Sequence, residues 1–186
     1  MRIKSLLIII AVAFFAISCG NNGSKRANVE AVVEVDALLS SAVEYTDKVI
    51  EVEGICTHIC QHGGRKMFLM GSNDTKTIRI ESGNLGAFDQ KCQNSIVKVI
   101  GTLCEERIDE AYLQNWEAAV AAKSAEEHGD GESGCDTEKK ARGETANTTS
   151  GRIADFRAKI AARKAAEGKE YLSFYYVIAE SYEVLE

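Results

Sequence analysis

The order of apolar and polar positions predicts short strands through most of the chain and helices in one later region. Runs rich in β-branched residues, in places alternating with polar ones, are typical of strands. They predict strands at residues 48–56, 66–70, 77–81, 96–103 and 171–178. Turn-forming residues at 61–64 and 71–74 separate the first three runs, so we expect these strands to follow one another as hairpins.

Three segments have helical spacing instead. The first begins at Val35, with Asp36 as the expected N-cap, and ends near Tyr45. The other two carry apolar residues at i, i+3 and i+7, namely Leu113, Trp116 and Val120, then Ile153, Phe156 and Ile160. They predict a helical hairpin within an insertion over 109–170, and the Gly-, Ser-, Thr- and charge-rich stretch 126–150 is expected to be a mobile loop.

Three close strands, a longer connection, a fourth strand and a distant fifth follow the order of an OB-fold, a small five-stranded barrel. Gly54 and Gly101 lie inside strands, where glycine suits the bends of barrel corners. The expected fold is therefore mainly β with α additions: an OB-fold-like barrel over 35–186 with the helical hairpin inserted between strands 4 and 5.

The stretch VDALLSSAVEYTDKVIEVEGI, a short helix leading into a strand, resembles the opening of the "tRNA anticodon-binding-like" OB domains of bacterial lipoproteins, particularly those of Bacteroidetes. The resemblance covers residues 35–103 and the final strand. It implies an OB-fold shape, because the label of that group describes the shape of the domain rather than tRNA binding.

The N-terminus has the pattern of an export signal. Arg2 and Lys4 precede the apolar run 6–17, which has signal-peptide length and is too short for a spanning helix. Ala16-Ile17-Ser18-Cys19 resembles the bacterial lipobox, in which the cysteine receives diacylglycerol and becomes the new N-terminus.

We therefore expect residues 1–18 to be removed as a lipoprotein signal peptide, leaving lipidated Cys19 and a flexible linker over 19–34. Acyl chains on Cys19 would hold the protein on a membrane without a transmembrane helix. The residues after Cys19 include neither an adjacent aspartate nor an acidic cluster, so known sorting patterns favour the periplasmic face of an outer membrane.

Charge narrows the possible partners. The chain has 22 Lys and Arg against 28 Asp and Glu, and loss of the two basic signal residues leaves 20 against 28, a net charge of −8. Nucleic-acid affinity depends on neutralising phosphates, so nucleic acid is not an expected partner. The expected partners are the membrane, through the lipid, and a protein, peptide or envelope component.

Five cysteines follow Cys19, at positions 56, 60, 92, 104 and 135. Disulfides are the first expectation in an oxidising periplasm, and the odd number leaves one thiol over. Cys56, His58, Cys60 and His62 recur at every second residue, which places them on one face of a straight strand. Over such a strand they would span ~20 Å, so four ligands to one metal would require a bend.

The loops that join strands 1–2 and 4–5 of an OB-fold flank the same binding face. This arrangement would bring Cys60 and His62 close to Cys135, which lies in the insertion, as does His128. One interpretation is a Cys60–Cys135 disulfide that pins the insertion to the barrel. The other is a transition-metal or haem contact made by Cys56, His58, Cys60, His62 and Cys135.

Catalytic motifs are missing from the sequence: its cysteines show C-x-x-x-C rather than C-x-x-C, and its serines lack a nucleophile-elbow context. The sequence therefore favours a non-enzymatic, lipid-anchored periplasmic binding module of unknown ligand, with no cofactor. The alternative is a metal- or haem-binding envelope protein that uses the Cys/His run 56–62.

Overall fold

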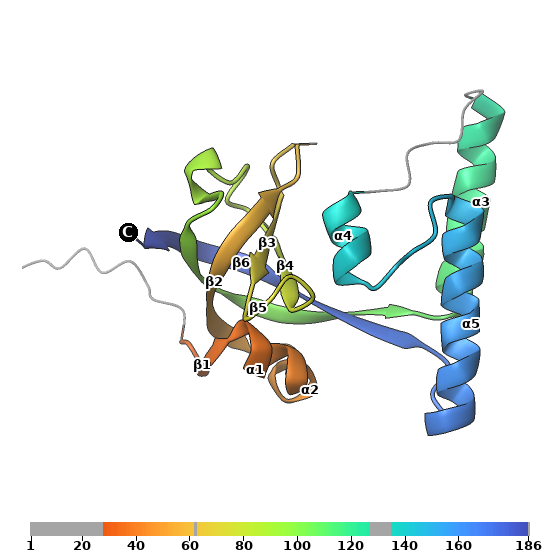
Figure 1. Ribbon diagram of the computed structural model, residues 1–186, viewed down its shortest axis with the longest axis horizontal. Helices are drawn as coiled ribbons and strands as arrows, with labels where there is room; N and C mark the ends of the chain where they lie inside the picture. The colour runs from red at the N-terminus through yellow and green to blue at the C-terminus, as the bar shows by residue number, and fades with distance from the viewer. Residues whose placement is uncertain (1–27, 62, 127–134, 186) are drawn as a thin grey trace, which may run out of the picture.

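The computed structural model describes residues 28–61, 63–126 and 135–185 (Figure 1). In chain order the elements are β1 (Ala31–Glu34), α1 (Val35–Ser40), α2 (Ala42–Tyr45), β2 (Val49–Ile59), β3 (Lys66–Met70), β4 (Thr77–Glu81), the 3₁₀ turn η1 (Gln90–Cys92), β5 (Ile96–Ile108), α3 (Glu110–Glu126), α4 (Asp136–Ala141), α5 (Thr149–Glu167) and β6 (Leu172–Leu185).

Five strands close into a barrel in the order β2-β3-β4-β6-β5, with β5 pairing back to β2. All neighbours are antiparallel except β4 and β6, which run parallel. This is the OB-fold order, and the helical insertion joins the fourth barrel strand, β5, to the fifth, β6. The predicted fold class is confirmed, and β3 and β4 have the predicted bounds.

The barrel core is made by inward-facing residues, which in β4 and in much of β2 and β5 alternate with exposed or half-buried ones. In β3, Met67, Phe68 and Leu69 are all buried. Burying such apolar side chains is the main favourable term in folding. Leu38 of α1 is also fully buried in this core. The completely buried aliphatic side chains of the barrel include Ile50, Val52, Leu69, Ile80, Val97, Val99, Leu103 and Val177.

Asp36 has a different role from the predicted one. Glu34 occupies the N-cap position of α1, and Asp36 lies within the first turn of the helix. The Asp36 carboxylate accepts hydrogen bonds from the Ser72 backbone N–H, at 2.8 Å, and from the Ser72 hydroxyl, at 2.7 Å. It therefore ties the turn between β3 and β4 to α1 instead of capping the helix.

Strand β1 lies in the part of the chain predicted to be linker. It pairs in parallel with the first half of β2, from Ala31 opposite Ile50 to Glu34 opposite Glu53. Ala31 and Val33 pack against the barrel core. A segment of four residues is too short to show the period-two pattern of a strand. Strand β1 can therefore be identified only from its pairing with β2 in the structure.

Strand β5 extends beyond its predicted end at 103 to Ile108, and there it pairs with the first residues of β6 as a two-stranded ribbon that carries the insertion (Figure 1). Strand β6 extends at its other end, from the predicted 178 to Leu185, where it pairs with the first half of β5. A second apolar core, built on Ile108, Leu113, Ile153 and Phe156, joins the ribbon to α3 and α5. The predicted helical hairpin is therefore present, with Val120 on its exposed side. None of the described helices is long and apolar enough to cross a membrane.

The prediction of a loop over residues 126–150 is wrong in part. Residues 136–141 form α4, and α5 begins at Thr149 with Thr148 as its N-cap. In Figure 1, α4 lies between the barrel and the α3–α5 pair. The sequence signal was weak because α4 has no buried apolar residue, and charged groups hold it in place instead.

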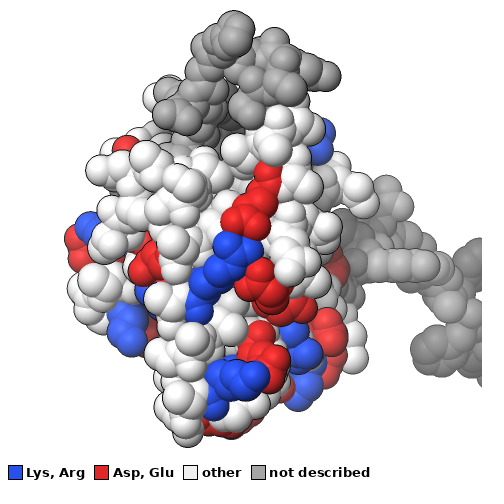
Figure 2. All heavy atoms as spheres, turned by 90° about the vertical axis from the view of Figure 1, so that its right-hand side faces the viewer, with Lys and Arg blue, Asp and Glu red and all other residues white. Residues whose placement is uncertain are grey.

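The side of the insertion formed by α3 and α5 carries charges of both signs, which alternate along a diagonal band in Figure 2. Arg157 reaches from α5 to Glu110 and Glu117 of α3, both at 2.7 Å. Exposed pairs of this kind stabilise a fold only slightly. The mixture of signs gives this face no continuous basic surface.

Close contact between β5 and β6 predicts that replacing Gly101 strongly destabilises the fold. A Cβ atom at Gly101 would lie 2.2 Å from the Ile178 carbonyl oxygen, next to a bulge in which β6 has one extra residue, Glu180, against β5. Since this oxygen and the Ala179 Cα atom, at 2.9 Å, are both backbone atoms, we expect Gly101→Ala to lower the free energy of unfolding by about 3 kcal/mol, measured by urea denaturation.

Gly168→Ala is the matched control for this substitution. Gly168 has φ 72° but no atom within 4 Å of its Cβ position, so only backbone strain of about 1 kcal/mol is expected. Equal losses in the two variants would contradict the steric explanation.

Candidate functional site

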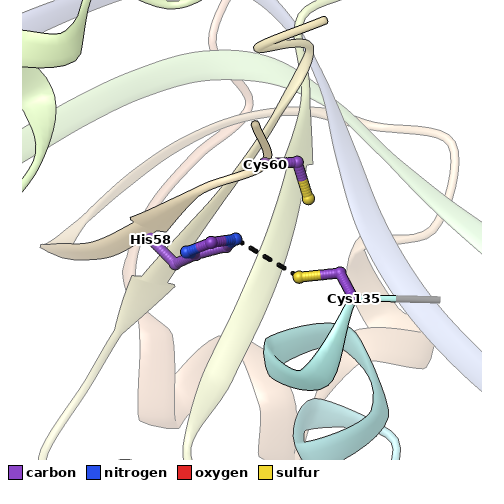
Figure 3. A group of neighbouring side chains, drawn as sticks. All are labelled: His58, Cys60 and Cys135. Atoms are coloured by element: carbon purple, nitrogen blue, oxygen red, sulfur yellow. Dashed lines mark hydrogen bonds between the residues drawn. The ribbon is translucent and has the colours of Figure 1, made fainter. Parts of the chain in front are cut away.

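Three side chains with metal-ligand chemistry meet where α4 approaches the end of β2: His58, Cys60 and Cys135 (Figure 3). The His58 Nε2 atom lies 3.2 Å from the Cys135 Sγ atom, and all three ligand atoms lie within 4.8 Å of one another. Cys60 is buried, whereas His58 and Cys135 are half-buried. Cys135 directly precedes α4, so the cluster joins the insertion to the barrel.

A β-bulge selects which members of the Cys/His run enter this cluster. Cys56 pairs with Leu69 and His58 with Phe68, which leaves Thr57 as an extra residue in β2. The bulge reverses the alternation of side chains. Cys56 therefore lies in the barrel core, and His58 and Cys60 face the insertion, so the prediction that the run shares one face is wrong.

Cys56 in β2 and Cys60, just after the end of β2, are buried thiols with raised pKa values. Burial, reinforced by nearby Cys92, raises the pKa of Cys56 to about 11. Burial, followed by the neighbouring Cys135 thiol, raises the pKa of Cys60 to about 12. Both are neutral thiols at neutral pH, and a thiolate at Cys60 requires a partner that replaces its proton.

The structure does not contain the predicted Cys60–Cys135 disulfide. All five cysteines within the described residues are free thiols: Cys56, Cys60, Cys92, Cys104 and Cys135. The Cys135 sulfur contacts the His58 ring, so His58 joins Cys60 and Cys135, as the alternative metal interpretation of the sequence expected and the disulfide interpretation did not. His62, His128 and Cys19 lie outside the described residues.

A cluster of charged side chains holds α4 against the barrel. No sequence motif predicted this cluster. Glu138 of α4 accepts from Arg79 of β4 at 2.6 Å, from Lys66 of β3 at 3.1 Å and from Arg142 at 3.2 Å. Glu106 of β5 receives Arg142 at 2.5 Å and Arg79 at 3.3 Å. Glu106 and Glu138 therefore share Arg79 and Arg142 in one cluster between the barrel and α4.

Through these contacts α4 covers the barrel face that the sequence analysis expected to bind a ligand. OB-folds bind oligonucleotides and oligosaccharides over their second and third strands, which are β3 and β4 here. A cavity of about 260 Å³ lies between this face and α4, and Phe68, Arg79 and Phe174 are among its lining residues. The chain's own insertion therefore lies over the expected binding face.

A larger depression, of about 830 Å³, lies beside β1 and the neighbouring part of β2. We call it the β1 groove. Its walls carry three apolar side chains that are well exposed: Val32 (74%), Ile55 (41%) and Ile96 (42%). Three exposed apolar side chains beside one depression give a partner apolar contact area.

The charged residues that line the β1 groove are all acidic: Glu34, Asp36, Glu51 and Glu53. Asp36 is engaged by Ser72, and Lys98 pairs with Glu51 at 3.6 Å. Glu34 and Glu53 are exposed, and the structure assigns them no ion pair within the described residues. The groove therefore combines apolar contact area with unneutralised negative charge.

No protein-family model matches the chain, and no curated protein is similar to it. One solved structure with a partial likeness is described as an aspartyl-tRNA synthetase from Leishmania major Friedlin. It is 17% identical, the match covers 44% of this chain and 17% of the synthetase chain, and the TM-score is 0.28. A likeness of this size carries no functional argument.

The charged cluster predicts a pH-dependent contribution to stability. Burial of the Glu138 carboxyl raises its pKa, but Lys66, Arg142 and Arg79 together outweigh burial and hold the pKa below the ordinary 4.5. A lowered pKa stabilises the fold above that value, and the contribution is lost as the pH falls through the folded-state pKa. We expect Glu138→Gln to cost about 2 kcal/mol at pH 7.

Urea denaturation of both proteins between pH 7 and pH 3 measures this effect. The difference between wild type and Glu138→Gln should stay constant down to the ordinary pKa and shrink below it. Asp136→Asn is the control on the same helix, since the Asp136 side chain is 97% exposed, and its cost should stay within about 0.5 kcal/mol. A pH-independent difference for Glu138→Gln would contradict the argument.

Proposed function

We propose that this chain is a lipid-anchored, non-enzymatic binding module of the bacterial envelope, and that its OB-fold-like barrel captures an extended peptide segment with basic and apolar residues. The single observation that carries the proposal is the β1 groove, which is the larger depression and is both apolar and acidic. This position replaces the face predicted from the sequence, which α4 covers.

The edge of β1 supplies the main-chain part of this recognition. Within the described residues β1 pairs with β2 alone, so its other edge offers backbone N–H and C=O groups. Extended peptides bind such edges as an added strand, with affinity from main-chain hydrogen bonds and specificity from side-chain pockets. Val32 and Ile55 offer apolar contacts, and Glu34 and Glu53 favour Lys or Arg in the peptide.

The proposed anchor places the groove near the membrane. Strand β1 begins twelve residues after Cys19, so the connecting segment reaches at most about 40 Å when fully extended. A partner protein on or near the periplasmic face of the outer membrane fits this reach. The net charge of −8 after signal removal supports a basic peptide over nucleic acid as the ligand.

Peptide titrations followed by NMR chemical shifts test the groove. A peptide of alternating lysine and valine should bind saturably and shift the signals of β1, whereas alternating glutamate and valine should not. Reversing both free carboxylates, Glu34→Lys with Glu53→Lys, should weaken binding at least about tenfold, because favourable charge pairs become repulsive.

Asp136→Lys makes the same kind of charge change on α4, away from the groove, and should leave the affinity nearly unchanged. Equal binding of the basic and acidic peptides, or shifts confined to β3, β4 and α4, would refute the proposed groove.

The anchor is tested separately. In a bacterial host, the wild-type chain should incorporate labelled palmitate and fractionate with the outer membrane, because acylation of Cys19 follows from the lipobox-like sequence. Cys19→Ser should lose the label and leave the membrane fraction, while Cys104→Ser should keep both properties. Retention of label in Cys19→Ser would show that the lipid is attached elsewhere.

A further inference from the structure

We propose that His58, Cys60 and Cys135 form a binding site for a Zn²⁺-like divalent ion, which fastens α4 of the insertion to the barrel. The inference is independent of the proposed peptide groove, because the two sites use different residues and different elements.

The geometry is close to what a tetrahedral ion requires. With Zn–S near 2.3 Å and Zn–N near 2.0–2.1 Å, ligand atoms around one zinc lie roughly 3.4–3.8 Å apart. The His58 Nε2 and Cys135 Sγ atoms are 3.2 Å apart, and all three ligand atoms lie within 4.8 Å of one another. Side-chain adjustments of about 1 Å would complete the coordination.

Contacts within the barrel position two of the ligands, Cys60 through its backbone and His58 through its ring. The Cys60 N–H donates to the Lys66 carbonyl at 2.9 Å, and the Cys60 carbonyl accepts from Gly64 N–H at 3.0 Å. The His58 ring lies against Phe68, with ring centroids 6.0 Å apart. Cys135 is fixed less directly, through α4 and its ion pairs with the barrel.

The donor set selects the class of ion. Two thiolates and an imidazole suit Zn²⁺ and other borderline to soft metals, whereas Mg²⁺ and Ca²⁺ prefer oxygen. Two thiolates and one divalent ion with a neutral imidazole sum to zero charge, which suits a half-buried position. Three protein ligands leave the fourth position to water. Haem fits less well, since a haem iron takes at most two axial ligands from the protein.

The ion would act as a cross-link. It would join β2 to a residue 75 positions beyond Cys60, and closing so long a loop removes much freedom from the unfolded chain. It would also hold α4 over the face of β3 and β4, beside the ion pairs of Glu138. Binding replaces the thiol protons, so the affinity should fall as the pH is lowered.

Cobalt and zinc titrations of the full chain test the site. The protein is purified without a histidine tag and kept under a non-chelating reductant. Co²⁺ should bind one per chain, with thiolate charge-transfer absorption and the intense visible bands of tetrahedral cobalt, and Zn²⁺ should displace it. Cys60→Ser and Cys135→Ser should each weaken binding at least about 100-fold, and His58→Gln at least about tenfold.

Cys104→Ser, which makes the same substitution outside the cluster, should bind as the wild type does. If buried Cys60→Ser fails to fold, half-buried Cys135→Ser still decides the outcome. Unchanged affinity in Cys135→Ser, or no metal-dependent spectrum in the reduced wild-type chain, would overturn the proposal. So would a Cys60–Cys135 disulfide in the exported protein that persists when Zn²⁺ is supplied.

Hydrogen exchange separates a cross-link from a surface ion. Zn²⁺ should slow exchange of the α4 amides at least about tenfold in the wild type and leave them unchanged in Cys135→Ser. Binding without any protection of α4 would overturn the fastening role of the ion.

Discussion

The pairing of β5 with two strands at once is the constraint on which the rest of the structure depends. Its first half pairs with β2 and closes the barrel, and its whole length pairs with β6. Gly101 allows the bend between these roles, because any side chain there would meet the backbone of β6. The same two strands continue past the barrel and carry the insertion, so barrel closure also fixes where α3, α4 and α5 lie.

The insertion then changes the function expected of the barrel. An OB-fold with a short loop in this position leaves its second and third strands open to ligands. Here α4 lies over them, held by Glu138 and its three cationic partners rather than by apolar packing. The β1 groove, beside the pairing of β1 with β2, stays open and is the surface that we propose for binding. The insertion also brings Cys135 to His58 and Cys60.

Much of the fold was readable from the sequence, and the reason is visible in particular elements. Strand β3 is a short apolar run and β4 alternates apolar and polar residues, and turn residues bound both, so the sequence gives their ends. The stripes of α3 and α5 predicted a helical hairpin because all their residues except the exposed Val120 do pack into the core between the two helices. By contrast, β1 and α4 are short and are stabilised by partners elsewhere in the chain. Strand β1 pairs with β2, and α4 is held by basic side chains of β3 and β4.

The sequence by itself determined the order of barrel strands, the position of the insertion and the residue types available for chemistry, because these follow from local periodicity and composition. Only the tertiary structure decided which residues meet. The extra residue at Thr57 reverses the alternation of side chains after it. Cys56, which precedes the bulge, stays in the core, and His58 and Cys60, which follow it, face Cys135. A bulge of this kind depends on how β2 pairs with β3, and no period within β2 alone records it.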